Sequence, residues 1–464
     1  MERLSARPRL LGLLVVAAAV PALMGAAMPT VAPRPAAAVL AVAPNVAVAP
    51  DAALPASIGA LASARPATPL AASSSTKPSR ILLTPTADPG TSQRISWTMP
   101  LPTKGQRVTY RVPGGPAKAV RATRGPATSV KNSGSAQPRY SATLVGLSPG
   151  TAYQYRIVTS RGSSAWHTFT TANPAAPSLT MIGLGDTQID NRGVPRATVR
   201  RALADAPEAQ LILQAGDVVD RPYKGSQWAD LFTAMGPAAR TRNWVVSIGN
   251  HEQCVLVLKC RSKQAQAFRS YFDWPDNGFP EQGETWFHVD YQGVRIVVLD
   301  SFGGRMAEQA AFLDKALTEN PSRWSIVLMH APPFATRPGR ANTEVRDAWL
   351  PIIEEHDVDL VLSGHDHSYA RGSRTANGPV FAVSVSGPKY YAVTDADWVL
   401  NKANRVVWAA ATSTYQVITV DGDTLTYRAV VTHRGQGSTS PFGPGGVLDQ
   451  FTIDKSDEGD KVVR

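Results

Sequence analysis

The chain has few cysteines, no Lys/Arg-rich run and, beyond its N-terminus, no apolar stretch long enough to cross a membrane. Two cysteines in 464 residues exclude a disulfide-rich scaffold, and no third cysteine or local histidine completes a site with them, which argues against a role of these two as metal ligands. The formal net charge is +11, but the basic residues are scattered along the sequence, so we expect no nucleic acid as a stable partner. No later segment offers the ~20 apolar residues that span a bilayer, so we expect no stable membrane partner either.

The N-terminus has the layout of a secretory signal peptide. Arg3, Arg7 and Arg9 precede the uncharged run Leu10 to Met28, and small residues and prolines follow. We therefore predict a signal peptide within residues 1–39, cleaved at an undetermined point, and a secreted protein. The alternative is an uncleaved membrane anchor, which the alanines and the Gly and Pro residues of this run would make weak.

Residues 40–77 are rich in Ala, Pro and Ser and show no sustained period, which predicts a flexible linker. The two cysteines, Cys254 and Cys260, are six positions apart. In an exported protein they are expected to form a disulfide that closes a small loop. The alternative is a pair of free thiols.

Residues 78–173 show short alternating segments separated by turn residues, which predicts a β-sandwich. The expected strands lie at Arg94 to Thr98, Val108 to Val112, Thr151 to Thr159 and Trp166 to Thr171. The turn Leu147 to Tyr153 and the last of these strands resemble fibronectin type III domains. Aromatic residues such as Trp97 and Trp166 are expected to lie in the core.

Residues 177–455 alternate strands with helices, which predicts a layered α/β domain, followed by a polar tail at residues 456–464. The expected strands are Leu179 to Leu184, Gln210 to Gln214, Trp244 to Ile248, Trp324 to Met329 and Asp359 to Leu362, with a hairpin over Phe287 to Asp300. The expected helices are Val194 to Ala206, Met306 to Glu319 and Val345 to Glu355.

Five clusters rich in Asp, Asn and His follow predicted strands of this domain. They are Gly185 to Gln188, Gly216 to Asp220, Gly249 to Glu252, Met329 to Pro333 and Gly364 to His367. The ligand crevice of such a sheet lies beyond the carboxyl ends of its strands, so the clusters are expected to meet there. Oxygen and imidazole donors suit first-row metal ions, and the set points to phosphoester hydrolysis at a two-metal site.

The order and content of these clusters resemble those of the calcineurin-like metallophosphoesterases. The chain is most similar to their purple acid phosphatase branch, whose members join a fibronectin-like domain to the catalytic one. Connecting segments such as Tyr271 to Gly278, Val297 to Ser301 and Ser386 to Lys389 share the likeness. The implied fold is an N-terminal β-sandwich followed by an α/β-β/α metallophosphoesterase domain.

The resemblance implies two metal ions per chain, of iron, zinc or manganese. One ion would be bound by Asp186, Asp217 and His367, and the other by the bridging Asp217 with Asn250, His330 and His365. His251 would point at the phosphate and protonate the leaving oxygen. A metal-bound hydroxide would attack a small phosphorylated substrate, in the first instance a phosphate monoester.

Two other functions stay open at this stage. A phosphodiesterase or nucleotide hydrolase could use the same centre, because substrate choice lies in loops. An exported, non-catalytic binding or adhesion protein is the alternative from another class, although every implied ligand is intact. The sequence makes no prediction of oligomeric state.

The chain departs from the purple enzymes at one position. Where they carry the tyrosine that colours ferric iron, this chain has Asp220, and Tyr223 lies three residues further on. We therefore expect an enzyme that is not purple, and either residue could take the place of the missing ligand. Gln188 stands where other metallophosphoesterases have a histidine ligand. Three roles are open for it: a weak oxygen donor to the metal, a hydrogen-bond partner of a ligand, or a polar residue without a role in the site.

Three further residues have weaker assignments. Glu252 could accept a hydrogen bond from a neighbouring ligand. Tyr369 and Arg371 follow the histidine pair as in the family, where they either shape the substrate pocket or pack behind the ligands.

Overall fold

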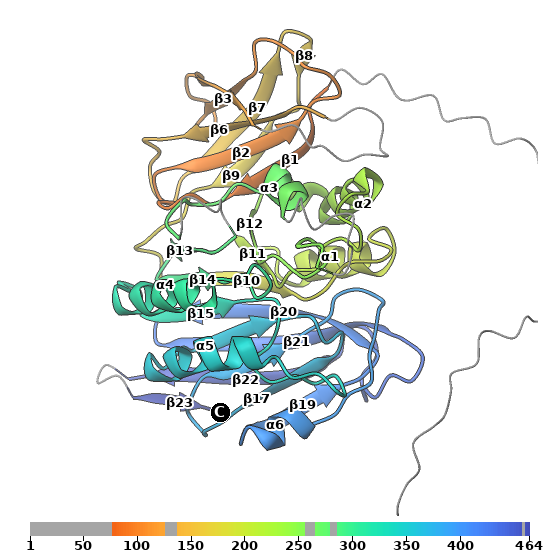
Figure 1. The fold of residues 1–464 in the computed structure, drawn as a ribbon. Coiled ribbons are helices and arrows are strands. Elements are labelled where there is room, and N and C mark those ends of the chain that lie inside the picture. The colour runs from red at the N-terminus through yellow and green to blue at the C-terminus, as the bar shows by residue number, and fades with distance from the viewer. Residues whose placement is uncertain (1–76, 126–136, 256–264, 279–284, 457–459) are drawn as a thin grey trace, which may run out of the picture. The chain divides into compact units, whose positions relative to one another are not determined.

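The structure is a computed structural model that describes residues 77–125, 137–255, 265–278, 285–456 and 460–464. These residues belong to one compact unit that extends from Leu70 to Arg464 (Figure 1). The predicted signal peptide, nearly all of the predicted linker and Cys260 lie outside the described residues.

The N-terminal part of this unit is built from strands alone. One group pairs in the order β1, β2, β6, β5, and the other has the order β4, β3, β7, β8, with β9 also paired to β7. The bounds are β1 (Ser79–Thr84), β2 (Gln93–Thr98), β3 (Arg107–Arg111), β4 (Lys118–Arg121), β5 (Thr123–Arg124), β6 (Arg139–Leu144), β7 (Ala152–Thr159), β8 (Gly162–Ser163) and β9 (His167–Thr170). The four strands predicted here are confirmed within two residues at each end.

The two strand groups share a core in which alternate residues of each strand are buried. Val108 and Tyr110 of β3 face Ile95 and Trp97 of β2 in one apolar cluster. The prediction that Trp97 lies in the core is confirmed, because it is 1% exposed. The same prediction for Trp166 is wrong, because this side chain is only half-buried and lies against the guanidinium groups of two arginines. The fibronectin-like assignment of this domain stays a prediction.

The α/β part has two sheets. The first contains β10 (Ser178–Leu184), β11 (Leu211–Gln214), β12 (Asn243–Val246), β20 (Thr412–Asp421), β21 (Thr424–Arg434), β22 (Val447–Lys455) and β23 (Lys461–Val463). The second contains β13 (Phe287–Tyr291), β14 (Val294–Val298), β15 (Trp324–Leu328), β16 (Leu360–Ser363), β17 (Tyr369–Ser373), β18 (Val380–Val383) and β19 (Asn404–Ala409). All strands predicted in this part are confirmed within two residues.

The helices are α1 (Val194–Asp205), α2 (Gly225–Met235), α3 (Gln266–Tyr271), α4 (Met306–Thr318), α5 (Thr343–Glu355) and α6 (Ala396–Leu400), with a 3-10 turn η1 (Gly236–Arg240). The three predicted helices correspond to α1, α4 and α5. None of the helices in the described residues is long and apolar enough to span a bilayer.

Side chains of the second sheet alternate between its two faces and contribute to two apolar layers. Ile296 and Ile326 lie in the larger cluster, which also holds the strands of the first sheet. Their neighbours Val297 and Val327 lie in a second cluster with side chains of α4 and α5, such as Leu313. Because successive residues of a strand point to opposite faces, the second sheet packs against the first sheet on one side and against helices on the other. The predicted layered α/β domain is thus observed (Figure 1).

One strand joins the β domain to the α/β domain. β1 pairs in parallel with β12 at Leu83 and Asn243, so a single path of eleven strands runs through both parts. Gln93 and Asn243 exchange side-chain hydrogen bonds at 2.8 and 3.2 Å in the same place. The sequence pattern did not indicate this connection, because the β1 segment was not recognised as a strand.

The parallel strands determine where the site is built. β10, β11 and β12 are mutually parallel in the first sheet, and β14, β15, β16 and β18 are parallel in the second. The carboxyl ends of parallel strands reach the same edge of their sheet, and the bridge from Asp186 to Val385 links the two sheets there.

Candidate metal centre

Six predicted ligands leave the ends of five strands. Asp186, Asp217 and Asn250 follow β10, β11 and β12 of the first sheet, and His330, His365 and His367 follow β15 and β16 of the second. The site therefore lies where the edges of the two sheets meet.

Two groups of donors in the structure can each hold a metal ion. One consists of Asp217, His330 and His365, and the other of Asp186, Asp217 and His367, with the donor atoms of each group within 4.8 Å of one another. Asp217 is common to both. Oδ1 of Asn250 lies 3.3 Å from Nε2 of His330, which places the amide oxygen beside the first group.

A buried orphan oxygen indicates that these residues fit a metal. Oδ2 of Asp186 is buried, has no hydrogen-bond partner, and lies 3.0 Å from Nε2 of His367. Oδ2 of Asp217 lies 3.1 Å from Nε2 of His330. Burying a carboxylate oxygen without a donor costs free energy, and a cation between these oxygens and the imidazole nitrogens would remove that cost.

Two ligand histidines are held in one orientation. Nδ1 of His330 donates to the carbonyl of Ala215 at 2.7 Å, and Nδ1 of His367 donates to the carbonyl of Lys389 at 3.0 Å. When Nδ1 carries the proton, Nε2 keeps its lone pair, which is the form of the ring that binds a metal. Nε2 of each ring faces a carboxylate of the cluster.

The backbone is strained at the ligands. Asp217, His365 and His367 have φ values of 46°, 70° and 51°, in the left-handed region that non-glycine residues enter at a cost of about 1–3 kcal/mol each. Two glycines let the backbone pass close to the carboxylates. A Cβ on Gly249 would lie 2.1 Å from Oδ1 of Asp217, and a Cβ on Gly364 would lie 2.1 Å from Oδ1 of Asp186. Strain of this kind concentrates at functional sites.

The cluster is electrostatically coupled. Burial opposes charge on His330, but the carboxylates of Asp217 and Asp186 outweigh it and raise the pKa of His330 to about 9. Burial would also favour neutral Asp217, yet His330 and His251 hold its pKa well below the usual range. Burial and the neighbouring His330 lower the pKa of His365 well below its usual value. Without a metal, a proton on His330 thus partly compensates the carboxylates.

His251 reaches the cluster from the side. Its backbone N–H donates to Oδ1 of Asp217 at 3.0 Å, and its Nε2 lies 3.8 Å from Oδ2 of the same residue. Its Nδ1 donates to the backbone carbonyl of Asp220 at 2.7 Å and lies 3.4 Å from the Asp220 carboxylate. Asp220 therefore lies behind His251. Tyr223, the other candidate for the missing tyrosine, is half-buried.

Glu252 fixes the loops that carry the ligands. Its carboxylate accepts three backbone hydrogen bonds of 3.0 Å, from Asp217, Val219 and Gly249. Burial and the nearby Asp217 carboxylate raise the pKa of Glu252 to about 7. The structure thus places Glu252 under the Asp217 turn.

Gln188 contacts both donor groups. Its amide nitrogen donates to Oδ2 of Asp217 at 3.1 Å and lies 3.2 Å from Nε2 of His367, while its own Oε1 is buried without a hydrogen-bond partner. The side chain therefore reaches the metal-binding atoms, which argues against a role as polar filler.

Tyr369 and Arg371 converge on another residue. The hydroxyl of Tyr369 donates to Asp449 at 2.7 Å, and the guanidinium of Arg371 forms two bonds of 2.8 Å to the same carboxylate. Tyr369 is fully buried in the large core cluster. These contacts correspond to the packing alternative for both residues.

Sequence reasoning missed the support of the histidine turn. Arg340 donates to the carbonyl of His365 at 2.7 Å and to Asp366 at 2.6 Å, and Asp366 also accepts from the backbone of Thr336 at 2.5 Å. Asp366 lies between the two ligands in sequence and is fully buried. Its position inside the Gly-His-Asp-His motif was the one signal that could have indicated this role.

Sequence reasoning also missed an aromatic and basic group beside His367. The ring of Tyr391 lies 4.5 Å from the His367 ring, with Cζ of Arg337 4.2 Å and Nζ of Lys389 5.6 Å from the Tyr391 ring. Arg337 and Arg340 also line a surface hollow of about 360 Å³. No sequence motif identifies these residues.

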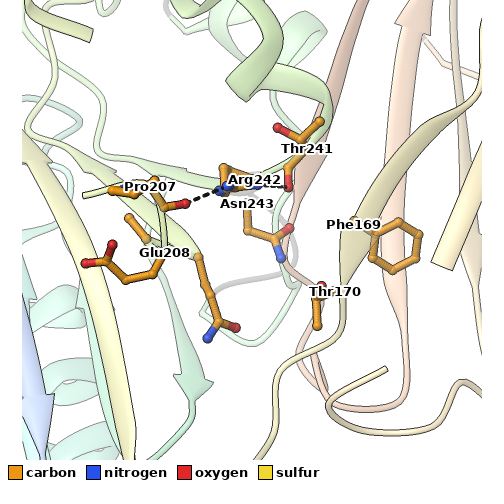
Figure 2. Close-up of a pocket in the computed structure, with 9 residues that line it drawn as sticks. Phe169, Thr170, Pro207, Glu208, Thr241, Arg242 and Asn243 are labelled. Carbon is orange, nitrogen blue, oxygen red and sulfur yellow. Dashed lines mark hydrogen bonds between the residues drawn. The ribbon is translucent and has the colours of Figure 1, made fainter. Parts of the chain in front are cut away.

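A second hollow, of about 270 Å³, has a different character. Figure 2 shows its lining, in which Arg242 donates to the carbonyl of Pro207 at 2.9 Å and Phe169 contributes an apolar wall. It contains one carboxylate, Glu208, and no histidine, so it lacks the donors of a metal site.

Cys254 is buried near the His251 loop. Its predicted partner, Cys260, lies outside the described residues, so the pairing stays a prediction.

Two family models match the chain. Residues 179–369 match the calcineurin-like phosphoesterase family, and residues 78–171 match the purple acid phosphatase N-terminal domain. The first match contains all six ligand candidates, and the second covers the β domain.

Curated relatives are similar over part of their length. Purple acid phosphatase 18 of Arabidopsis thaliana is 25% identical over 51% of this chain and 54% of its own length. Phosphoenolpyruvate phosphatase of Allium cepa is 26% identical over 37% of this chain and 38% of its own length. The chain thus spans about half or less of these relatives.

Solved structures share the fold. The purple acid phosphatase PPD1 from yellow lupin seeds superposes with a TM-score of 0.64 at 16% identity, over 82% of this chain and 75% of that one. The structure of PhoD superposes with a TM-score of 0.60 at 14% identity, over 85% of this chain and 93% of that one.

Proposed function

Since the chain carries a calcineurin-like phosphoesterase domain behind a purple acid phosphatase N-terminal domain, we propose that it is a metal-dependent hydrolase of phosphate monoesters with a dinuclear centre. The observation that carries the proposal is the pair of donor groups that share Asp217. One carboxylate with two oxygens can serve two cations and reduce their mutual repulsion.

The donor groups suggest how the two ions would be held. Asp186, Asp217 and His367 would bind one, and Asp217, Asn250, His330 and His365 the other. When bound, the ions would supply Lewis acidity that neutralises charge on the phosphoryl oxygens. The oxygen and imidazole donors suit iron, zinc or manganese.

His251 is placed to move the proton. Since its Nδ1 is held by the Asp220 carbonyl, Nε2 is the ring atom available at the cluster. A proton held there can pass to the oxygen of the leaving alcohol, which is the step that general acid catalysis accelerates. The Asp220 carboxylate lies 3.4 Å from Nδ1, on the side of the ring away from Nε2.

The environment of Asp220 also supports a colourless enzyme. The side chain at the position of the colour-giving tyrosine is a carboxylate, and it lies beside His251. With no phenolate there, iron in the site would lack the ligand that makes related enzymes purple.

A second candidate function is hydrolysis of nucleotides or other substrates with a second anionic group. The group of Tyr391, Arg337 and Lys389 beside His367 favours it, because neither cation has an ion-pair partner among the described residues. An aromatic ring with two cations next to the metal ligands suits a phosphate or base on the leaving group.

The same proposal includes export from the cell. It is supported by the charged start and the long uncharged run of the sequence, and a disulfide between Cys254 and Cys260 would be compatible with it. A non-catalytic role in adhesion is less favoured, because all of the predicted ligands converge.

The test is activity with defined metals. Purified full-length protein would be assayed on a chromogenic phosphomonoester and on the matching diester with manganese, zinc or iron, and its bound metal measured. We expect turnover on the monoester, two metals per chain, and loss of both in Asp217→Asn. Absence of turnover with every metal, or an unchanged rate in Asp217→Asn, would overturn the proposal.

A further inference from the structure

The positive charge of the chain is concentrated in the β domain. Residues 77–172 contain thirteen Lys and Arg residues and a single acidic one, Asp88, whereas the whole chain carries a formal charge of +11. The remainder is therefore close to neutral. The excess of basic over acidic residues therefore belongs to one structural part, and such an asymmetry indicates an anionic partner.

The strands place several arginines on one face of the sheet that contains β3, β4 and β7. Along β3, Val108 and Tyr110 are buried, and Arg107 and Arg111 alternate with them on the other side. Along β7, Ile157 is buried and Arg156 alternates with it. Because successive residues of a strand point to opposite faces, these arginines share the outer face of the sheet.

The register brings like charges together. Arg107 of β3 lies directly opposite Arg121 of β4, and Arg156 of β7 lies opposite Thr109 of β3. Like charges directly opposite each other destabilise a sheet. Within the described residues, no acidic side chain forms an ion pair with Arg107, Arg111, Arg121 or Arg156, so no carboxylate neutralises these charges.

Trp166 orders two of the guanidinium groups. Cζ of Arg111 lies 4.5 Å and Cζ of Arg156 4.7 Å from the centre of its ring, and Nε of Arg111 donates to Gln154 at 3.0 Å. A guanidinium held against an aromatic ring can still direct its terminal N–H groups at phosphate oxygens. We call Arg107, Arg111, Arg121 and Arg156 with Trp166 the arginine face.

We propose that the arginine face binds a linear polyanion with a repeating phosphate group. Its charges extend over about 13 Å along β3 and about 5 Å between neighbouring strands, a spread that a single phosphate cannot bridge. The ring of Trp166 is already covered by guanidinium groups, which disfavours stacking of a nucleobase and insertion into a membrane. Charge complementarity therefore favours a phosphate chain without bases over a nucleic acid and over a membrane surface.

The experiment measures binding of long-chain inorganic polyphosphate to the full-length protein at several salt concentrations, with the polymer length checked afterwards. We expect binding that weakens steeply with salt. The double variant Arg107→Gln/Arg121→Gln should weaken binding about tenfold and lower the salt slope by roughly 1.5, since each phosphate contact contributes about 0.7–0.9. Its thermal midpoint should stay equal or rise, because the like-charge pair is removed.

The matched control is Arg196→Gln/Arg200→Gln, which removes two exposed arginines of α1 and the same net charge. It should leave polyphosphate binding unchanged. Equal weakening in both double variants would overturn the proposal in favour of net charge alone. Binding to phosphatidylglycerol vesicles but not to polyphosphate, or equal competition by inorganic phosphate, would also overturn it. Hydrolysis of a phosphomonoester is measured in parallel. It tests the proposed function, and its result does not depend on whether the arginine face binds polyphosphate.

Discussion

Nδ1 of His251 donates to the backbone carbonyl of Asp220 at 2.7 Å, and the carboxylate of Asp220 lies 3.4 Å from the same nitrogen. Both contacts come from the residue that stands where related purple enzymes carry tyrosine. The carbonyl fixes the ring with Nε2 toward the donor cluster, where it lies 3.8 Å from Oδ2 of Asp217. Asp220 thus forms part of the surroundings of the proposed proton carrier, His251.

The first prediction concerns this pair. His251→Gln should lower kcat on a phosphomonoester by about 10²–10⁴-fold, because the proton donor to the leaving oxygen is lost. Asp220→Asn keeps the carbonyl contact and should lower kcat by about tenfold or less, with KM nearly unchanged. Steady-state kinetics across pH measures both. Equal losses in the two variants would show that the carboxylate does more than support the ring.

The second prediction concerns Glu252, whose carboxylate accepts hydrogen bonds from three backbone N–H groups. Glu252→Ala leaves three buried donors without an acceptor, and each costs about 1–3 kcal/mol. We therefore expect roughly 3 kcal/mol or more of lost stability in urea unfolding of the metal-free protein. The control is Glu308→Ala on the first turn of α4, where the carboxylate is exposed and its removal should change stability far less than Glu252→Ala. Similar losses in both variants would contradict the role given to Glu252.

The convergence of the candidate ligands could be predicted because it depends on local signals. Each ligand follows a short apolar strand, and parallel strands bring their carboxyl ends to one edge, so Asp186, Asp217 and His330 converge once the strands are assigned. The turn glycines mark the same positions, since Gly249 and Gly364 lie where no Cβ fits. Local pattern and global topology agree there.

Features that depend on pairing between distant segments could not be predicted. The outer position of Trp166 depends on arginines of β3 and β7, and the continuous sheet depends on β1 meeting β12. The long antiparallel pair β20 and β21 was also missed, because neither strand is followed by a motif of the kind that ends the parallel strands. The contact of Arg340 with Asp366 joins two loops that nothing in the sequence associates.

The third prediction concerns the pH dependence of stability through Asp300. Burial, only partly offset by the N–H of Phe302 and other donors, raises the pKa of Asp300 to about 6. The folded protein therefore keeps a proton that the unfolded chain, with a pKa of about 3.9, has lost. Between about pH 4 and pH 6 the folded state binds more protons, so this residue makes stability fall as pH rises through that window.

Asp300→Asn cannot ionise and should remove this contribution. The stability of the variant relative to the unmodified protein should rise from about pH 4 to about pH 6 and then stay constant. Urea unfolding at intervals across this range gives the difference directly, and other carboxylates cancel in it. A difference that does not vary with pH would show that Asp300 ionises normally in the folded protein.

The last prediction separates the two candidate substrate classes through Arg337 and Lys389. If the leaving group carries a second phosphate, these cations beside Tyr391 contact it, and Arg337→Ala/Lys389→Ala should raise KM for a nucleoside diphosphate by about tenfold while kcat changes little. KM of the double variant for a small chromogenic monoester should stay within about twofold of that of the unmodified protein. This substrate has no second anionic group for the two cations to contact. Tyr391→Phe keeps the ring over which Arg337 lies and serves as the matched control, since only the hydroxyl is lost. Equal KM increases for both substrates would mean that the cations act on the reacting phosphate itself, and the monoesterase would then have no site for a second anionic group here.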